Sequence, residues 1–195
     1  MLARLRKSSP LALAVIAAIA LGACGDSHTK VTSGTYAGES GKNAPYLHVG
    51  PLVYEVQLSR ELNPYDAEDA SYLQGLTPTQ QKLEAGQEWF GVFVQVYNSG
   101  SQPLPAASEF TVSDTQGNTY TPIVPAQANG FAYRPASVPG NGRVPAPDTI
   151  AANGPTQGAL LLYKIQTVSL DNRPLTIKIV DPTDAAETAS AELDV

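Results

Sequence analysis

The segment from Trp89 to Asn98, WFGVFVQVYN, constrains the fold more than any other part of the chain. Side chains alternate across a strand, so this segment presents one aliphatic-rich face and one aromatic face, formed respectively by Phe90, Val92, Val94 and Val96 and by Trp89, Phe93 and Tyr97. β-branched and aromatic residues favour strands, and Asn-Ser-Gly-Ser at 98–101 provides a turn. The segment therefore predicts a central strand that is covered on both faces.

Further short apolar segments, separated by turn residues, predict the remaining strands. We expect strands over residues 52–58, 110–114, 119–121, 157–165 and 174–180. The tetrad at 115–118 is typical of a hairpin turn, and residues 171–174 predict the turn between the last two strands. Alternation places Leu52, Tyr54, Val56 and Leu58 on one face of the first strand, and Leu175, Ile177 and Ile179 on the inner face of the last. About seven strands and no long amphipathic helix predict an all-β, antiparallel β-sandwich.

The N-terminus has the features of an export signal. Arg4, Arg6 and Lys7 precede an apolar run over 11–21, which is too short for a membrane-spanning helix. The sequence LGAC at 21–24 resembles the lipobox of bacterial lipoproteins. Its Cys24 is the only cysteine, so no disulfide within the chain explains it, whereas attached acyl chains would. We predict a signal peptide over 1–23 and lipidation of Cys24; an ordinary signal peptide and an uncleaved anchor are the alternatives.

Composition divides the rest of the chain. Residues 24–45 are small and polar, which predicts a flexible tether behind the lipidated cysteine. We assign residues 46–183 to the sandwich domain and 184–195 to an acidic tail that either adds a short strand or has no fixed structure. Residues 125–155 form a long Pro/Gly-rich loop, and we expect Phe131 and Tyr133 to attach part of it to the sandwich.

The charge balance argues against one class of partner. Without Arg4, Arg6 and Lys7 the mature chain holds 9 basic residues against 18 acidic ones. Nucleic-acid binding depends on neutralising phosphates with Lys and Arg, and the sequence has no basic stripe for this purpose. We therefore expect no nucleic-acid partner.

An acidic loop within residues 59–76 is the candidate contact site. It contains Tyr65, Asp66, Glu68, Asp69 and Tyr72, which suit contact with a protein or glycan partner or with a hard cation such as calcium. The spacing of the carboxylates is not that of an EF-hand, so we assign no metal ligand. A solvated acidic loop whose tyrosines cover an edge of the sandwich is the alternative.

Catalytic and cofactor chemistry have few candidate residues. His28 falls in the predicted tether and His48 near the first strand, so neither joins a recognisable Ser/His/Asp arrangement. Soft metals need several His, Cys or Met ligands, but Cys24 is assigned to lipid and the only Met is Met1. We predict no enzyme activity and no cofactor. A hydrolase that uses carboxylates alone is the remaining catalytic alternative.

A resemblance to a known family adds to this interpretation. The apolar strand that ends in YNSG at 97–100, the Pro103-Leu104 pair, Phe110 and the turn SDTQGNTY at 113–120 resemble the DUF4352, telokin-like immunoglobulin domains of bacterial lipoproteins. The resemblance covers roughly residues 52–181 and implies an immunoglobulin-like sandwich. It implies no catalytic role, and the acidic loop and the long proline-rich segment have no counterpart in it.

Together these features predict a lipid-anchored, extracytoplasmic protein of the cell membrane. Its sandwich would serve as a non-catalytic binding or scaffold domain that meets an envelope protein or glycan. The alternative is an accessory protein that binds a small ligand or a cation for envelope transport or sensing.

Overall fold

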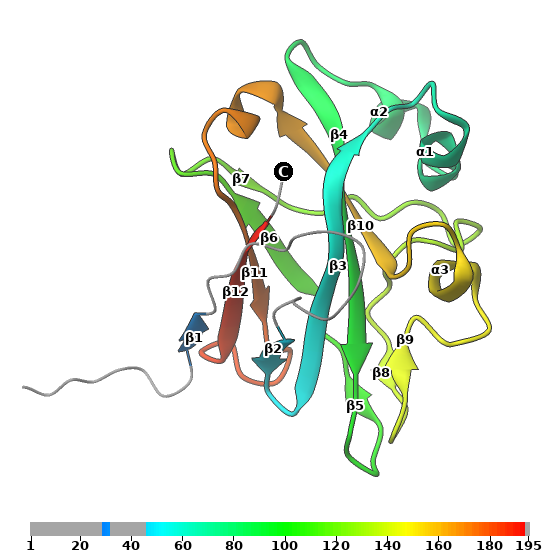
Figure 1. Ribbon diagram of the computed structural model, residues 1–195, viewed down its shortest axis with the longest axis vertical. Coiled ribbons are helices and arrows are strands. Elements are labelled where there is room, and N and C mark those ends of the chain that lie inside the picture. The colour runs from blue at the N-terminus through cyan, green and yellow to red at the C-terminus, as the bar shows by residue number, and fades with distance from the viewer. Residues whose placement is uncertain (1–28, 32–45, 194–195) are drawn as a thin grey trace, which may run out of the picture.

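The computed structural model describes residues 29–31 and 46–193. The predicted signal peptide (1–23), Cys24 and most of the predicted tether lie outside the described residues. Within them the chain is an all-β sandwich in which two sheets face each other (Figure 1).

The first sheet has the order β10-β4-β3-β2, all antiparallel, with β9 paired to the end of β4. Its strands are β2 (Tyr46–Val49), β3 (Leu52–Leu62), β4 (Gln87–Tyr97), β9 (Arg143–Val144) and β10 (Ala159–Gln166). As predicted, the segment after Glu88 is a central strand: β4 lies between β3 and β10 from Trp89 to Val94, and its last two residues lie between β3 and β9.

The second sheet has the order β1-β12-β11-β6-β7. Its strands are β1 (Thr29–Val31), β6 (Glu109–Ser113), β7 (Thr119–Tyr120), β11 (Leu175–Val180) and β12 (Thr188–Leu193). All pairings in this sheet are antiparallel except that of β1, which runs parallel to β12. The predicted hairpin over 110–121 is confirmed as β6 and β7.

Short elements complete the described chain. They are α1 (Ala67–Tyr72), α2 (Pro78–Gln81), β5 (Leu104–Pro105), β8 (Ser137–Val138), α3 (Ile150–Asn153) and the 3₁₀ helix η1 (Thr167–Leu170). β5 and β8 pair with each other. Figure 1 shows α1 and α2 at one end of the first sheet, and α3 farther along β10.

The two faces of β4 enter two different apolar clusters, as its alternation predicts. Phe90, Val92, Val94 and Val96 lie in the main core between the sheets. Trp89 and Phe93 lie on the outer face of the first sheet, in a second cluster that also contains Leu62, Tyr72, Leu76, Leu160 and Leu162. β4 is therefore buried on both sides because a second set of apolar residues covers the sheet from outside.

A β-bulge changes the predicted face of one residue in β3. The register with β4 shifts between Val56 and Leu58. Residues before the shift, such as Tyr54 and Val56, face the main core, whereas Leu58 packs on the second cluster with Leu62. The prediction that Leu58 shares a face with Val56 is wrong, because one extra residue inverts the alternation that follows it.

The C-terminal segment belongs to the sandwich. Thr188–Leu193 forms β12, whose Ala189, Ala191 and Leu193 are buried in the main core. Of the two alternatives for the C-terminal segment, the added strand is the one observed, so the predicted domain bound at residue 183 is corrected to Leu193. The alternating small residues of β12 suit a strand that lies between β1 and β11. Because these residues are only weakly hydrophobic, the strand pattern in the sequence is weak.

The proline-rich loop over 125–155 is attached to the sandwich at several points. Tyr133 is buried and its hydroxyl donates to the Ala107 carbonyl (2.8 Å), while Phe131 packs on the second cluster. The predicted roles of both residues are confirmed. The loop also contributes β8, β9 and α3, which its proline content did not indicate.

Candidate functional site

The candidate site lies on a helical cap, which we define as residues 63–81 with α1 and α2. The cap covers the second apolar cluster on the outer face of β3, β4 and β10. It contains the whole of the predicted contact loop. The structure separates that loop into carboxylates that hold the cap together, one buried tyrosine and one exposed tyrosine.

Asp66 begins α1. Its Oδ1 accepts the backbone N–H groups of Glu68 (2.9 Å) and Asp69 (3.2 Å), which are otherwise unpaired at a helix start. Asp66, one of the acids of the predicted contact loop, is therefore the N-cap of α1. α2 begins in a similar way, with a capping box between Thr77 and Gln80.

Asp69 joins the cap to the sandwich. Its carboxylate accepts hydrogen bonds from both terminal nitrogens of Arg60 on β3 (3.0 and 2.5 Å) and from the backbone N–H of Asn63 (2.7 Å). The residue is 4% exposed. Burial alone would raise the pKa of Asp69, but the Arg60 guanidinium and the Asn63 N–H outweigh it and lower the pKa below its ordinary value. The carboxylate is therefore ionised and structural.

Glu68 connects the cap to two neighbours. Its Oε1 accepts the Tyr72 hydroxyl (2.8 Å) and the Thr156 hydroxyl (3.2 Å), and it lies 3.5 Å from an Arg60 nitrogen. Thr156 follows α3, so this carboxylate ties α1 to the segment before β10. The bonds are partly exposed, so each contributes little on its own.

The two tyrosines of the predicted contact loop have opposite surroundings. Tyr72 is 0% exposed, with its ring edge-on to Phe93 (5.1 Å between centroids) and to Phe131 (4.9 Å). Burial raises the pKa of its hydroxyl. Tyr72 is therefore a core residue of the cap and not a contact residue, which corrects that part of the prediction. Tyr65, by contrast, is 96% exposed.

The loop carboxylates accept hydrogen bonds from protein donors. Asp66 is a helix cap, Asp69 pairs with Arg60, and Glu68 accepts two hydroxyls. Within residues 29–31 and 46–193, no group of three or more His, Cys, Asp or Glu side chains is placed to hold a metal ion. The geometry favours a structural role for these three acids.

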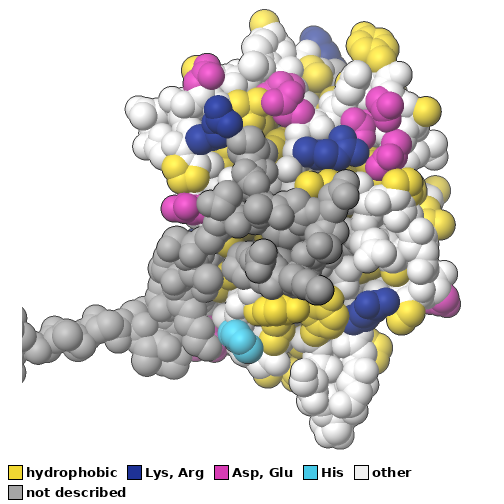
Figure 2. All heavy atoms as spheres, in the orientation of Figure 1, with side chains coloured by type: hydrophobic (Ala, Val, Ile, Leu, Met, Phe, Trp, Pro, Cys, Tyr) yellow, Lys and Arg dark blue, Asp and Glu magenta, His cyan; other side chains and the backbone are white. Residues whose placement is uncertain are grey.

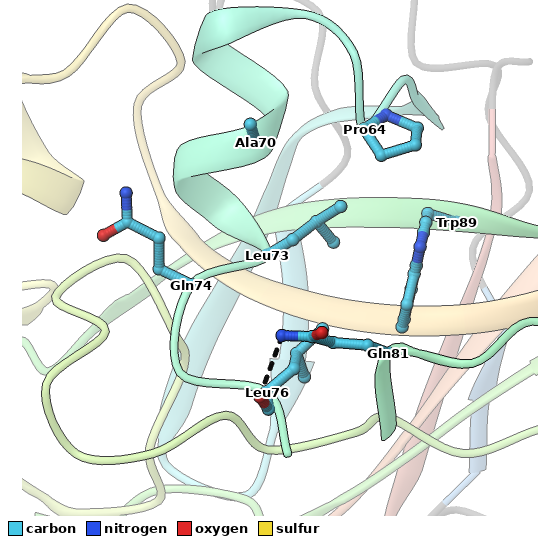
Figure 3. Close-up of a pocket in the computed structure, with 7 residues that line it drawn as sticks. All are labelled: Pro64, Ala70, Leu73, Gln74, Leu76, Gln81 and Trp89. Atoms are coloured by element: carbon cyan, nitrogen blue, oxygen red, sulfur yellow. Dashed lines mark hydrogen bonds between the residues drawn. The ribbon is translucent and has the colours of Figure 1, made fainter. Parts of the chain in front are cut away.

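A pocket of about 340 Å³ opens between the two helices of the cap and β4. Its lining is mainly apolar and includes Trp89 from the sheet and Leu73 and Leu76 from the cap; the other lining residues are Pro64, Ala70, Gln74 and Gln81. Figure 3 shows Pro64 and Leu73 on the cap side with the Trp89 ring across from them. Lys164 lies over the Trp89 ring, with its Nζ 5.2 Å from the centroid.

The sequence did not single out the pocket residues. Leu73 and Leu76 stand three residues apart, which is a helical spacing, but they fall in a stretch interrupted by Gly75. Trp89 was expected on an apolar face, yet nothing in the sequence indicated what would cover it. The signal available was the aromatic outer face of β4, which requires some covering element.

Asn129 is a further residue that sequence reasoning missed. It is 4% exposed, and its Nδ2 donates to the carbonyls of Tyr72 (2.9 Å) and Gln74 (2.8 Å) at the end of α1. Its Oδ1 accepts the N–H groups of Phe131 and Ala132. Every hydrogen-bonding position of this amide is used, so the proline-rich loop fixes the end of the cap helix.

The remaining surface features add little chemistry. Figure 2 shows basic and acidic side chains interspersed over the face that carries the upper part of β3. His48 lies exposed on β2, opposite Val53 in the register. In the part of the chain that the structure describes, no helix has both the length and the apolar character needed to cross a bilayer.

Comparisons with known proteins find similar solved structures but no family. No protein-family model matches the sequence, and none of the curated proteins matches it. Among solved structures, a Bacillus subtilis strain 168 protein (ycdA), described provisionally as a lipoprotein, is 11% identical with a TM-score of 0.43. The match covers 76% of this chain and 38% of that protein, so this chain spans well under half of its length.

A second solved structure is similar over most of both chains. It is an uncharacterised β-sandwich protein of Clostridium difficile 630, 10% identical with a TM-score of 0.43, and the match covers 84% of this chain and 95% of that one. Neither likeness bears on activity. The fold class follows from the sheet topology itself, which makes this chain an all-β sandwich with a helical cap on one outer face.

Proposed function

We propose that the protein is a lipid-anchored, extracytoplasmic lipoprotein whose sandwich carries a non-catalytic contact site on the helical cap. The observation that carries this proposal is the pocket beside Trp89, five of whose seven lining residues are apolar. Tyr65 follows Pro64, which lines the pocket. Exposed tyrosine beside an apolar depression fits a protein contact, because aromatic residues are enriched at such contacts.

The rigidity of the cap supports a preformed site. Binding loops on a β-sandwich work best when the scaffold fixes them, because less conformational entropy is then lost on binding. The Asp69–Arg60 pair joins the start of α1 to β3, and Asn129 fixes the end of α1. Tyr72 fills the space between α1 and the outer face of the first sheet. The site would therefore bind without a large rearrangement.

The sequence supports the membrane anchor. The lipobox-like LGAC places Cys24 at the end of an export signal, and one cysteine with two or three acyl chains is sufficient for lasting attachment. The resemblance to telokin-like domains of bacterial lipoproteins agrees with this proposal. The domain would stand on the outer face of the cytoplasmic membrane and meet an envelope protein or glycan.

The pocket lining supports a binding role over a catalytic one. Its seven residues include no carboxylate, histidine or cationic side chain. General acid–base catalysis needs such a group within hydrogen-bonding reach of the reacting atoms. A contact site needs only shape, apolar area and a few amides, which Gln74 and Gln81 provide.

A small apolar ligand is a second candidate for the pocket. Ligand sites commonly have volumes of about 300 to 1,000 Å³, and the pocket of about 340 Å³ lies at the lower end of that range. This alternative predicts that a ligand raises the melting temperature of the isolated protein, because only the folded state binds it. A macromolecular contact predicts no such rise with small molecules.

Photo-crosslinking in intact cells tests the proposal. A photo-reactive residue replaces Tyr65, and a matched one replaces Gln116, which is exposed in the β6–β7 turn. We expect a discrete covalent product from position 65 and none from position 116. We also expect the product to disappear when Leu73→Gln is added to make the pocket polar. Equal products from both positions, or a product that survives Leu73→Gln in a folded protein, would count against the site.

A further inference from the structure

The structure places part of the predicted tether in the sandwich. Thr29–Val31 forms β1, which pairs in parallel with the first half of β12, Thr29 opposite Thr188 and Val31 opposite Ser190. Figure 1 shows β1 at the outer edge of the second sheet beside β12. The expectation of one uninterrupted flexible tether over 24–45 is therefore corrected at these three residues.

The position of β1 along the chain determines how far the domain can stand from Cys24. Only residues 25–28 separate Cys24 from Thr29, which allows a reach of at most about 17 Å. If β1 were released, the first described residue attached to the sandwich would be Tyr46, where β2 begins. The greatest possible distance between Cys24 and the sandwich would then be about 75 Å.

The energetics of β1 allow both arrangements. The strand has three residues, so it forms few backbone hydrogen bonds. Each contributes little net stability, because it replaces a hydrogen bond to water. Ordering three residues costs conformational entropy of similar size. A pairing of this kind is close to balance, unlike β12 against β11, which pairs over six residues.

The outer edge of β12, which β1 partly covers, could pair with another strand. Among the described residues, β1 pairs with Thr188–Ser190 and leaves the outer edge of Ala191–Leu193 without a strand. Release of β1 would lengthen this open edge to the whole of β12. Open strand edges accept further strands, so a longer open edge favours pairing with an extended segment.

We propose that β1 is a releasable clasp that sets the distance between the sandwich and the membrane. The proposal rests on the lipid anchor at Cys24 described above. With β1 paired, the anchor leaves the domain beside Thr188 and holds the β11–β12 turn close to the bilayer. With β1 released, the domain hangs from Tyr46, and the cap reaches partners farther from the membrane.

Energy transfer on vesicles tests the clasp with the lipidated full-length protein. Ala185→Cys places a dye in the exposed β11–β12 turn, where it is the only free thiol once Cys24 is acylated. Acceptor dyes are carried by lipid headgroups. The clasp variant is Thr29→Pro with Val31→Pro, because proline cannot donate to a ladder. The control is Ser40→Pro with Lys42→Pro, which places the same residues at the same spacing outside β1.

We expect strong transfer in the parent and the control, and weaker transfer in the clasp variant, because the greatest possible distance between Cys24 and the sandwich rises from about 17 Å to about 75 Å. Hydrogen exchange of the 188–190 amides should become faster in the clasp variant alone. Equal transfer and equal exchange in all three vesicle-bound proteins would overturn the clasp and leave the anchor standing. A parent protein that does not remain with the vesicles would overturn the anchor and, with it, the membrane role of β1.

Discussion

Asp69→Ala should separate the helical cap from the sandwich. The substitution removes an acceptor of three hydrogen bonds, two from Arg60 and one from the Asn63 N–H. Breaking a buried ion pair from one side commonly costs about 3 to 5 kcal/mol, since the partner charge is left without compensation. The Arg60 side chain is 31% exposed, so water replaces part of its lost contact, and Glu68 remains 3.5 Å from an Arg60 nitrogen. We therefore expect a loss of about 3 kcal/mol in the free energy of unfolding.

Two variants in the same acidic loop provide matched controls. Asp66→Ala removes the N-cap of α1 and should cost about 1 kcal/mol. Glu68→Gln removes a charge from a partly exposed pair with Arg60 and should cost less than about 1 kcal/mol. The three carboxylates lie within four residues of sequence, so only their surroundings distinguish them.

Equilibrium unfolding in urea measures all three, because urea does not screen ion pairs as a guanidinium salt does. A loss of 3 kcal/mol corresponds to a fall of about 6 to 12 °C in melting temperature for a domain of this size. Hydrogen exchange should show the loss of protection in α1 before that in β4. If Asp69→Ala costs no more than Glu68→Gln, the cap does not depend on the buried pair and our description of the site fails.

Three further predictions concern the sandwich itself. Tyr163→Phe should leave stability unchanged or raise it by about 1 kcal/mol in urea unfolding, because the buried Tyr163 hydroxyl lacks a hydrogen-bond partner within the described residues; a loss above about 1 kcal/mol would show that the hydroxyl is satisfied. Asp114 has a pKa lowered to about 2, because hydrogen bonds from the Asn118 side chain, the Ser169 hydroxyl and two backbone N–H groups outweigh the desolvation that would raise it. Its stabilisation is therefore complete above about pH 4 and is lost as the pH falls towards 2, so the stability gap between wild type and Asp114→Asn should narrow over that range, and a gap independent of pH would contradict this. Gly50→Ala should destabilise the protein by about 2 kcal/mol, since Gly50 has φ +55° and an added Cβ would collide with the Asp181 carboxylate; an unchanged melting temperature would mean that this turn can move aside.

Strands in which apolar and polar residues alternate were predictable, because burial of one face of a strand makes every second residue in the sequence apolar. Leu175, Ile177 and Ile179 lie in the core as expected, whereas Lys178 between them is exposed. β4 was predictable for the stronger reason that both of its faces are apolar, so it had to be central. These are local patterns that the strand geometry imposes directly.

Other features depend on contacts between distant segments and left no local signal. The bulge before Leu58 reflects the register with β4, and the alternation of β3 gave no warning of it. β12 consists of small and polar residues whose burial follows from their position beside β11. β1 is a strand only because it lies against the edge of β12.

The sequence located the candidate loop, but it did not indicate the structural role of Tyr72 or of the three carboxylates. The acidic loop does form the cap, yet its carboxylates are used as a helix cap and as attachments to Arg60 and Thr156. Sequence could not distinguish Tyr65 from Tyr72, because burial of one depends on Phe93 and Phe131 far along the chain. Long-range packing therefore decides which loop residues remain available to a partner.

Both proposals depend on attachment of the exported chain through Cys24, and mass spectrometry of the N-terminal peptide tests this most directly. The protein would be purified from the membrane fraction of its own host and digested. We predict a peptide that begins at Cys24 and carries the mass of covalently attached acyl chains. A peptide that begins elsewhere, or an unmodified Cys24 thiol, would contradict the anchor and remove the membrane from both proposals.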